Sequence, residues 1–368
     1  MIEAQAAVLW PDEDQLAIEP VALAPPRDDE VLIKVTASGI CHTDLVLMGA
    51  SVVERPVVLG HEGSGVVQAV GAAVTSLKPG DPVVMSYASC GHCGACNDQA
   101  AAYCDQFFPL NFMGRRLDGE WSMLCREQSV GSRIFGQSAL ANFAVCHVRN
   151  VVKIDARMPL KLAGPLGCGL QTGAGAVLNS LAVPQGAEVL VLGAGAVGLA
   201  AIMTASSIVG AATVAALDIH PSRLALAQSV GATQVFDGRR EDVFATLQAA
   251  FPSGVQYIID TTGQVDLVNQ CAALLATRGR LGLVASYDPQ SMLSMNAVTV
   301  LTRGQHVQGI MAGDSDIQRL IPELVAHYLE GRFPIDRLVR YYAFAEVNDA
   351  VAASRSGSVV KPIVVMAD

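Results

Sequence analysis

Four cysteines within one short segment have the spacing of a metal site. The segment runs from Cys90 through Cys93 and Cys96 to Cys104, so the cysteines follow the pattern C-x2-C-x2-C-x7-C. Four thiolates at these intervals can surround one Zn²⁺ tetrahedrally and close its coordination shell, as in structural zinc sites. An iron–sulfur cluster is the main alternative. His92 lies inside the segment, but four thiolates already suffice, so we do not expect it to be a ligand.

A second motif is typical of a dinucleotide-binding turn. The apolar run Glu188–Leu192 leads into Gly-Ala-Gly-Ala-Val-Gly at residues 193–198, between an expected strand and an expected helix, and this context makes G-x-G-x-x-G more specific. Gly193 would permit the tight turn, Gly195 would let the backbone reach the pyrophosphate, and Gly198 would let helix and strand pack closely. Asp218 follows the last glycine by 20 residues. Its carboxylate could bind the adenosine ribose and repel a 2′-phosphate, which favours NAD over NADP.

Three dispersed residues could form another metal site. Cys41 lies in G-I-C-H-T-D, His61 in G-H-E-G-S-G and Cys168 in G-P-L-G-C-G. Each alone could be an ordinary core cysteine or a hydrogen-bonded histidine. All three lie in glycine-bearing segments, and the nucleotide motif follows closely after the third, which favours a catalytic centre.

The surrounding patterns predict two kinds of domain. Residues 4–37 and 57–85 alternate short apolar runs with polar turns, which indicates antiparallel strands. Residues 88–120 lack periodicity, and a loop of that length should be functional or held by something. From about Leu170 strands alternate with helices, which indicates a doubly wound parallel sheet. We therefore expect an α/β protein with one mostly antiparallel domain, 1–170 and 314–368, and one parallel domain, 171–313.

The expected elements have the following bounds. The strands are Ala4–Leu9, Glu30–Val35, Val57–Val70, Pro82–Met85, Glu188–Leu192, Ala212–Leu217, Gln234–Phe236, Val255–Asp260, Arg280–Val284 and Lys361–Met366. The helices are Ala196–Val209, Pro221–Val230, Glu241–Ala250, Gln264–Leu275 and Ile317–Glu330.

The charge and cysteine content of the chain limit the classes of partner and the compartment that we expect. The formal net charge is −10 and no Lys/Arg cluster stands out, so neither nucleic acid nor an anionic membrane is an expected partner. Nine cysteines, an odd number, without an export signal favour a reducing cytoplasm over a disulfide framework. Residues 189–217 are uncharged and long enough to span a bilayer, but their four glycines favour a strand, a turn and a buried helix.

Together these motifs resemble the zinc-containing medium-chain alcohol dehydrogenases. The resemblance covers essentially the whole chain, in order, and also includes G-C-G-L-Q-T-G-A-G after residue 166. Within that family the chain is most similar to bacterial aryl-alcohol (benzyl alcohol) dehydrogenases. The resemblance implies a GroES-like catalytic domain, with its zinc lobe at 88–120, and a Rossmann domain. It also implies two Zn²⁺ per subunit, NAD as cofactor, and a homodimer or homotetramer for which Leu301–Gly313 could supply an edge strand.

The resemblance also implies roles for single residues. Cys41, His61 and Cys168 would bind the catalytic zinc and leave one coordination position open, as in the Cys₂His zinc site of alcohol dehydrogenase. Glu62 would lie just behind the metal, and Asp44 would orient His61. The residues matched to cofactor or substrate positions are His42 and Lys361 for the pyrophosphate, Arg223 for the adenosine ribose, and Tyr87 and Leu140 for the substrate pocket, although either of the last two could be core.

The expected reaction converts a primary aryl or allylic alcohol and NAD⁺ into an aldehyde, NADH and a proton. A zinc Lewis acid would lower the pKa of the bound alcohol, and the Thr43 hydroxyl could accept its proton and pass it onward. Many family members carry a histidine three residues further along, where this chain has Val46. Water, ribose hydroxyls or His42 could therefore complete the proton path.

Other functions compete with this one. The chain shows no distinct cationic cluster for a glutathione adduct, which disfavours a glutathione-dependent formaldehyde or S-nitrosothiol dehydrogenase. A non-catalytic zinc- and nucleotide-binding module, or a zinc-free quinone reductase, is disfavoured because all the residues matched to catalytic zinc ligands are present.

Overall fold

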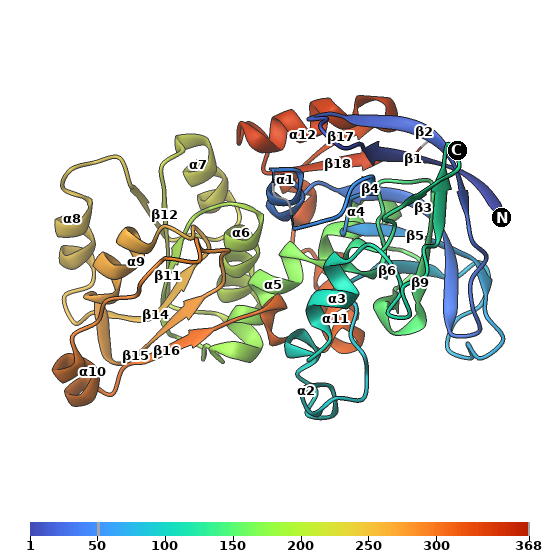
Figure 1. The fold of residues 1–368 in the computed structure, drawn as a ribbon. Coiled ribbons are helices and arrows are strands. Elements are labelled where there is room, and N and C mark those ends of the chain that lie inside the picture. The colour runs from blue at the N-terminus through green and yellow to red at the C-terminus, as the bar shows by residue number, and fades with distance from the viewer. Residues whose placement is uncertain (50–51, 367–368) are drawn as a thin grey trace. The chain divides into compact units, whose positions relative to one another are not determined.

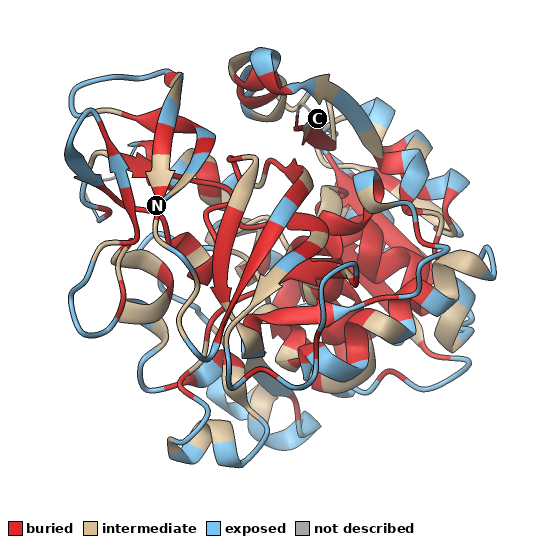
Figure 2. Ribbon diagram, turned by 90° about the vertical axis from the view of Figure 1, so that its right-hand side faces the viewer, coloured by how far each residue is buried: buried red, intermediate tan, exposed pale blue. Residues whose placement is uncertain are grey.

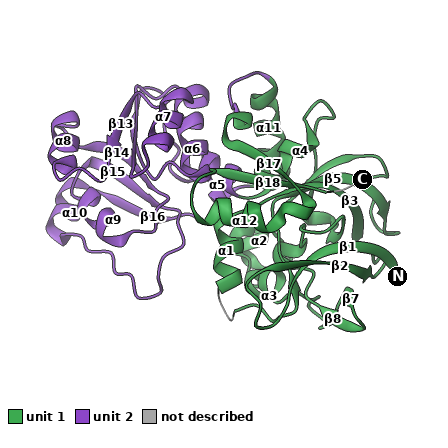
Figure 3. Cartoon of the chain, turned by 90° about the horizontal axis from the view of Figure 1, so that it is seen from above, with its two compact units in different colours: residues 1–168, 316–329, 335–368 green, residues 169–315, 330–334 purple. Residues whose placement is uncertain are grey.

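The computed structural model describes residues 1–49 and 52–366, which divide into two compact units (Figure 3). Unit 1 comprises residues 1–168, 316–329 and the tail from residue 335, and unit 2 comprises residues 169–315 and 330–334. The unit boundaries lie two residues from the expected ones. The one larger difference is the short segment 330–334, which was expected in the first domain and clusters with unit 2.

Unit 1 is built on two sheets of mostly antiparallel strands (Figure 1). One has the strand order β4-β1-β2-β7-β8, and the other has the order β10-β6-β5-β3-β18-β17 with β9 also paired to β3. The strands of unit 1 are β1 (Ile2–Leu9), β2 (Leu16–Leu23), β3 (Glu30–Gly39), β4 (Val57–Val58), β5 (Gly63–Val70), β6 (Pro82–Met85), β7 (Met123–Cys125), β8 (Gln128–Val130), β9 (Phe143–His147), β10 (Val151–Lys153), β17 (Val339–Ala343) and β18 (Lys361–Val365).

Short helices and turns connect these strands. They are α1 (His42–Gly49), α2 (Gly94–Asn97), η1 (Ala101–Tyr103), α3 (Phe107–Phe112), η2 (Ile134–Gly136), η3 (Val148–Asn150), α4 (Leu160–Ala163), η4 (Gly164–Gly167), α11 (Ile317–Leu329), η8 (Ile335–Leu338), η9 (Phe344–Glu346) and α12 (Val347–Arg355). The helix α1 was not expected, and the segment 88–120 contains three short helical turns rather than loop alone.

Strand β3 is the centre of the unit 1 core. Its side chains are buried along almost the whole strand, because β5, β9 and β18 all pair with it. Figure 2 shows the buried residues of the chain in red, many of them in the strands. The expected strand Val57–Val70 is interrupted: residues 59–62 leave the sheet between β4 and β5. The pairing of Ser38 with Gly63 places that interruption beside the end of β3.

Glu30 anchors β3 to two segments that are distant in the sequence. Its buried carboxylate accepts hydrogen bonds from Arg116 at 3.0 and 2.7 Å and from Arg133 at 3.0 Å. Burial alone would raise the pKa of Glu30, but the hydrogen bond from Arg116 and the charge of Arg133 outweigh it and lower the pKa to about 2. The ionised carboxylate thereby holds the chain around Arg133 against the sheet.

We expect Glu30→Gln to lower the free energy of unfolding most at neutral pH. A carboxyl whose folded pKa lies below its unfolded value of 4.5 contributes stability above pH 4.5, and this is lost as pH falls towards 2. The difference corresponds to roughly 3 kcal/mol. Urea unfolding at pH 7 and pH 3 should show the gap between wild type and variant narrowing at pH 3. Asp118→Asn, which removes an exposed partner of Arg27, is the control and should change little. An equal gap at both pH values would contradict the prediction.

Unit 2 is a parallel six-stranded sheet with helices between the strands, which confirms the expected doubly wound class. The strand order is β13-β12-β11-β14-β15-β16. The strands are β11 (Glu188–Leu192), β12 (Thr213–Asp218), β13 (Gln234–Asp237), β14 (Val255–Asp260), β15 (Leu275–Leu283) and β16 (His306–Gly309). The helices and turns are α5 (Gly169–Gly175), η5 (Ala176–Ser180), α6 (Ala196–Met203), η6 (Thr204–Val209), α7 (Pro221–Ser229), α8 (Val243–Ala250), α9 (Val265–Ala272), α10 (Ala297–Arg303) and η7 (Ala312–Asp314).

The long apolar stretch at 189–217 forms the centre of unit 2. It contains β11, α6, the π-helical turn η6 and β12, and Gly210, with φ +76°, ends the helical part. In residues 1–49 and 52–366, no helix has both the length and the apolar character that crossing a membrane requires.

Candidate active site and metal centres

Unit 1 brings Cys41, His61, Glu62 and Cys168 together. One ligand atom from each lies within 4.8 Å of those of the others. Cys41 lies just after the end of β3. His61 and Glu62 lie next to each other in the interruption before β5, and Cys168 lies just after η4. The pairing of β3 with β5 therefore explains why the first two segments meet, although they are 20 residues apart in sequence.

Asp44 connects the segments that carry Cys41 and His61. Its buried carboxylate accepts hydrogen bonds from the backbone N–H of Cys41 at 2.9 Å and of Gly60 at 3.1 Å. It also lies 3.0 Å from Nδ1 of His61. A carboxylate can only accept, so Nδ1 of the neutral ring carries the proton and Nε2 keeps a lone pair.

The position of His61 Nε2 fits a metal ligand. The atom is buried and has no hydrogen-bond partner among the residues that the structure describes. A buried imidazole nitrogen without a hydrogen-bond partner lowers the stability of the fold, unless it coordinates a metal. Two thiols within 4.8 Å and a carboxylate on the other ring nitrogen are the surroundings expected for a Cys₂His zinc site.

Glu62 forms a buried ion pair with Lys361. The Lys361 ammonium lies 2.9 and 2.8 Å from the two carboxylate oxygens and donates to the Ile40 carbonyl at 3.1 Å. Burial raises the pKa of Glu62 to about 7 although the charge of Lys361 opposes it. Burial alone would lower the pKa of Lys361, but the charges of Glu62 and Cys41 raise it.

The side chain of Lys361, which the resemblance assigns to the pyrophosphate, is buried beside Glu62. Lys361 begins β18, which pairs with β3, and this pairing places its side chain behind the Cys41 segment. The residue is 3% exposed, and its ammonium donates hydrogen bonds to Glu62 Oε1 and to the Ile40 carbonyl.

The four cysteines of the second group also converge. The Sγ atoms of Cys90 and Cys96 are 3.9 Å apart, as are those of Cys93 and Cys104. All four lie within 4.8 Å of one another. Thiolates on one tetrahedral Zn²⁺, with Zn–S bonds of about 2.3 Å, are separated by about 3.8 Å. An iron–sulfur cluster would hold its thiolates further apart, because irons and sulfides lie between them, so a single ion fits better.

Backbone donors surround these sulfurs. The N–H of Cys90 donates to Cys104 Sγ at 3.2 Å, that of Gly91 to Cys96 Sγ at 3.4 Å, and that of Cys93 to Cys90 Sγ at 3.3 Å. Such bonds favour thiolates over thiols, which suits a metal site. The ring of His92 instead faces the Cys90 carbonyl, 3.0 Å from Nδ1, and His92 is not among the clustered ligands.

The three motif glycines of unit 2 occupy positions that suit a dinucleotide. Gly193 has φ +91°, a left-handed conformation that favours glycine. A Cβ at Gly195 would meet no atom within 4 Å, so the backbone there is open to a ligand. A Cβ at Gly198 would lie 1.8 Å from the Gly193 carbonyl oxygen, which shows that helix and turn are in close contact. Gly195 is also the N-cap of α6, whose N-terminal N–H groups favour phosphate.

Asp218 ends β12 beside this turn. One carboxylate oxygen accepts the Ala194 N–H at 2.7 Å and the other accepts the His220 N–H at 2.8 Å. The residue is 6% exposed. Arg223 lies in the first turn of α7 and is half-buried. The structure thus fixes the Asp218 carboxylate beside the glycine turn.

The remaining predicted site residues have varied positions. His42 is exposed at the start of α1, and the Thr43 hydroxyl lies 3.9 Å from Cys41 Sγ. Tyr87 is buried, with its ring 6.0 Å from that of Phe107. Leu140 belongs to the hydrophobic core of unit 1, which supports its interpretation as a core residue.

Two residues at the site were missed by the sequence analysis. Gln137 donates to the His61 carbonyl at 3.0 Å and accepts the Gly63 N–H at 3.1 Å. The Phe135 ring stacks on the His61 imidazole at 4.5 Å. Their turn carries no recognisable motif, and only its contacts with the His61 segment reveal it.

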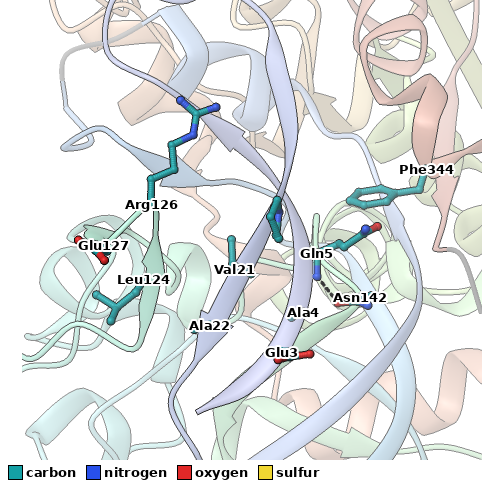
Figure 4. A pocket seen from close by; sticks show the side chains of 11 residues that line it. Glu3, Ala4, Gln5, Val21, Ala22, Leu124, Arg126, Glu127, Asn142 and Phe344 are labelled. Atoms are coloured by element: carbon teal, nitrogen blue, oxygen red, sulfur yellow. Dashed lines mark hydrogen bonds between the residues drawn. The ribbon is translucent and has the colours of Figure 1, made fainter.

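A surface cavity of unit 1 lies elsewhere. It has a volume of about 730 Å³ and lies over β1, β2 and the end of β7, with Gln5, Arg126, Glu127 and Phe344 among its lining residues (Figure 4). The Gln5 backbone N–H donates a hydrogen bond to Asn142 Oδ1 at 2.8 Å there. None of the candidate metal or nucleotide residues lines this cavity, so it is not the proposed reaction site.

The antiparallel unit with two metal-ligand clusters and the parallel unit with a dinucleotide turn define a zinc-binding dehydrogenase. Residues 27–156 match the family model for an alcohol dehydrogenase GroES-like domain, and residues 196–326 match that for a zinc-binding dehydrogenase. The chain is 42% identical over 366 residues to geraniol dehydrogenase of Castellaniella defragrans, covering 99% of this chain and 98% of that protein.

Solved structures agree with these matches. An alcohol dehydrogenase zinc-binding domain protein from Burkholderia ambifaria is 42% identical with a TM-score of 0.97, and benzyl alcohol dehydrogenase from Acinetobacter calcoaceticus is 38% identical with a TM-score of 0.95. Both comparisons cover 100% of each chain. The chain belongs to the zinc-containing medium-chain alcohol dehydrogenase family, and the resemblance seen in its motifs is confirmed. It is a zinc-dependent oxidoreductase of alcohols that uses NAD.

Proposed function

We propose that this enzyme oxidises primary alcohols whose hydroxyl-bearing carbon is benzylic or allylic. The observation that carries the proposal is a group of three partly exposed aromatic rings: Phe135 stacks on His61, and Phe107 and Phe112 pack against Phe135. Flat apolar faces beside a metal ligand favour planar, conjugated substrates over short aliphatic ones. The similarity to a geraniol dehydrogenase and a benzyl alcohol dehydrogenase supports the same class.

Cys41, His61 and Cys168 would hold the catalytic zinc in this proposal, and the four-cysteine lobe would hold the structural one. The zinc, when bound, supplies a Lewis acid that makes an alcohol proton more acidic, and NAD supplies the hydride acceptor. Asp44 keeps the His61 proton on Nδ1. The Lys361 charge compensates that of Glu62, so the region behind the ligands gains no net charge from this pair.

The surroundings of the Thr43 hydroxyl support a role in transfer of the alcohol proton. The hydroxyl lies 3.9 Å from Cys41 Sγ and is half-buried, whereas the side chain of Val46 is 44% exposed and cannot carry a proton. A hydroxyl can accept one proton while donating its own, so Thr43 can act as a relay. His42, exposed at the preceding position in the chain, is available for the following step.

A panel of alcohols tests the substrate class. Benzyl, cinnamyl and geranyl alcohols should have kcat/KM values with NAD at least about tenfold above those of ethanol and butanol, because one or two buried apolar groups contribute 1–3 kcal/mol of discrimination. Equal or better turnover of short aliphatic alcohols would contradict the proposal. Formaldehyde turnover that depends on glutathione would favour the alternative dehydrogenase.

We expect Thr43→Val to lower kcat by about 10²-fold or more, since loss of a positioned proton acceptor typically has that effect. The variant keeps the shape of the side chain, so the zinc content should stay at two per subunit. Thr43→Ser retains the hydroxyl and should recover most of the rate. Wild-type turnover in Thr43→Val would show that the proton leaves by another route.

The edge of the unit 2 sheet bears on the oligomeric state of the enzyme, and its cysteines bear on the cellular compartment. We propose a homodimer or homotetramer that forms along the β16 edge of the unit 2 sheet, where Val298, Leu301 and Val307 are exposed. Leu301→Glu should lower the molar mass measured by light scattering if that edge is the interface. The thiol-rich metal sites suit a reducing cytoplasm.

A further inference from the structure

Phe135 has an unusual backbone conformation for its type. It lies in the left-handed region with φ 50° and ψ 34°, and the same turn also includes Gly136 and Ser138 at positive φ. Bulky residues avoid this region, which glycine or asparagine adopt at much lower cost. Such strain persists only where the surroundings hold it, and it often marks a functional position.

The turn around Phe135 is fastened to the His61 segment from both sides. Ser138 Oγ donates to the Val58 carbonyl at 2.7 Å and accepts the Ile134 N–H at 2.9 Å. The Ala139 N–H donates to the Gly60 carbonyl at 2.7 Å. Together with the bonds of Gln137 to His61 and Gly63, these contacts hold the turn rigidly against the chain that carries the imidazole.

The aromatic ring itself covers one face of the imidazole. The Phe135 and His61 ring centroids are 4.5 Å apart with an interplanar angle of 26°. Phe107 and Phe112 meet Phe135 edge-on, at 6.3 and 5.2 Å, so the covering ring is supported in turn. Both supporting rings come from α3, which follows the four-cysteine segment directly.

Asp44 alone does not define the orientation of His61. Its hydrogen bond fixes Nδ1, but the imidazole can still turn about the line through that bond, because the terminal torsion of histidine is soft. A stacked ring on one face removes this freedom. Nε2 then points in a single direction, as a ligand with a defined bond angle must.

We propose that Phe135 is a positioning residue that holds the His61 imidazole in the plane required for metal binding. In this view the left-handed backbone at residue 135 places the ring against the imidazole. The role is separate from any contact between Phe135 and an alcohol, and it holds whichever alcohol is the substrate.

Two variants separate the ring from the backbone. Phe135→Asn removes the ring but adopts the left-handed conformation readily, so the backbone of the turn should be retained although the packing of the ring is lost. Phe135→Tyr keeps the ring. The control is Phe108→Leu, because Phe108 stacks on Phe112 at 5.3 Å and is 50% exposed, away from His61.

The readout is the release of zinc from the purified full-length enzyme to a chromogenic chelator. We expect Phe135→Asn to lose one of its two zinc ions at least about tenfold faster than wild type, as is typical when a residue that supports a metal ligand is removed. The second zinc should leave at the wild-type rate. The Co²⁺-substituted variant should also show a changed d–d absorption spectrum, since this reports ligand geometry directly. Phe135→Tyr and Phe108→Leu should behave as wild type in both measurements.

Unchanged zinc release and an unchanged cobalt spectrum in Phe135→Asn would overturn the proposal, even if KM for benzyl alcohol rose. That combination would assign Phe135 to the substrate pocket only. If Phe135→Asn folds poorly, Phe135→Leu provides the same comparison with the apolar volume retained. Faster loss of both zinc ions would show a general loosening of unit 1 and would likewise contradict a specific role at His61.

Discussion

Replacing Cys168 with alanine should reduce kcat/KM for benzyl alcohol by at least about 10³-fold, since the Lewis acid contributes several kcal/mol and each 1.36 kcal/mol is a factor of ten. Cys168 is one of three proposed protein ligands that converge within 4.8 Å, and a site with two ligands should bind Zn²⁺ weakly. Metal analysis should therefore find one zinc per subunit, at the four-cysteine lobe, instead of two.

Cys125→Ala is the matched control for this prediction. Cys125 is buried at 1% exposure but lies outside both metal-ligand groups. It should keep two zinc ions and near-wild-type activity, with only a modest loss of stability. Full activity in Cys168→Ala, or two zinc ions retained after dialysis, would show that the proposed centre is not where the reaction occurs.

The second large effect concerns the choice of cofactor. Asp218→Gly should raise the ratio of NADP to NAD efficiency by at least about 10²-fold, because a fixed carboxylate facing a 2′-phosphate costs several kcal/mol by like-charge repulsion. The carboxylate is fixed by the N–H groups of Ala194 and His220 and lies beside the glycine turn. Initial rates with both cofactors over a range of concentrations measure the ratio.

Asp218→Asn separates charge from shape in this experiment. The amide oxygen can still accept one of the two backbone hydrogen bonds, so the turn should be less disturbed than in Asp218→Gly. Asp242→Asn serves as the control, because Asp242 pairs with Arg240 on the exposed surface. A cofactor ratio that stays at the wild-type value in both Asp218 variants would refute the assigned role.

The two local motifs were recognisable from the sequence because their residues are close together in the chain. Cys90 to Cys104 span 15 positions, and a segment that short can close around one ion without help from distant parts. The turn at Gly193 is likewise local, since one strand, three glycines and one helix define it. Strand and helix bounds were less certain, as shown by the interruption of Val57–Val70 and the earlier start of β15.

The contacts between distant segments were decided by the tertiary structure. The pairing of β18 with β3 brings Lys361 next to Glu62, which lies 299 residues away in the sequence. No pattern of neighbouring residues predicts a contact over that separation. Phe135 was overlooked for a related reason: a phenylalanine in an apolar stretch resembles any core residue until the turn that holds it is known. The backbone conformation of that turn is the signal that would have distinguished it.

Residue types and spacing alone determined that this protein carries a four-thiolate metal lobe and a dinucleotide turn, because both depend on neighbours along the chain. Only the tertiary structure decided that Cys41, His61 and Cys168 meet. It also decided which group pairs with the Lys361 ammonium and which ring stacks on the His61 imidazole. Those arrangements depend on strand pairing across many residues, where loop closure and packing, rather than local preference, select the partners.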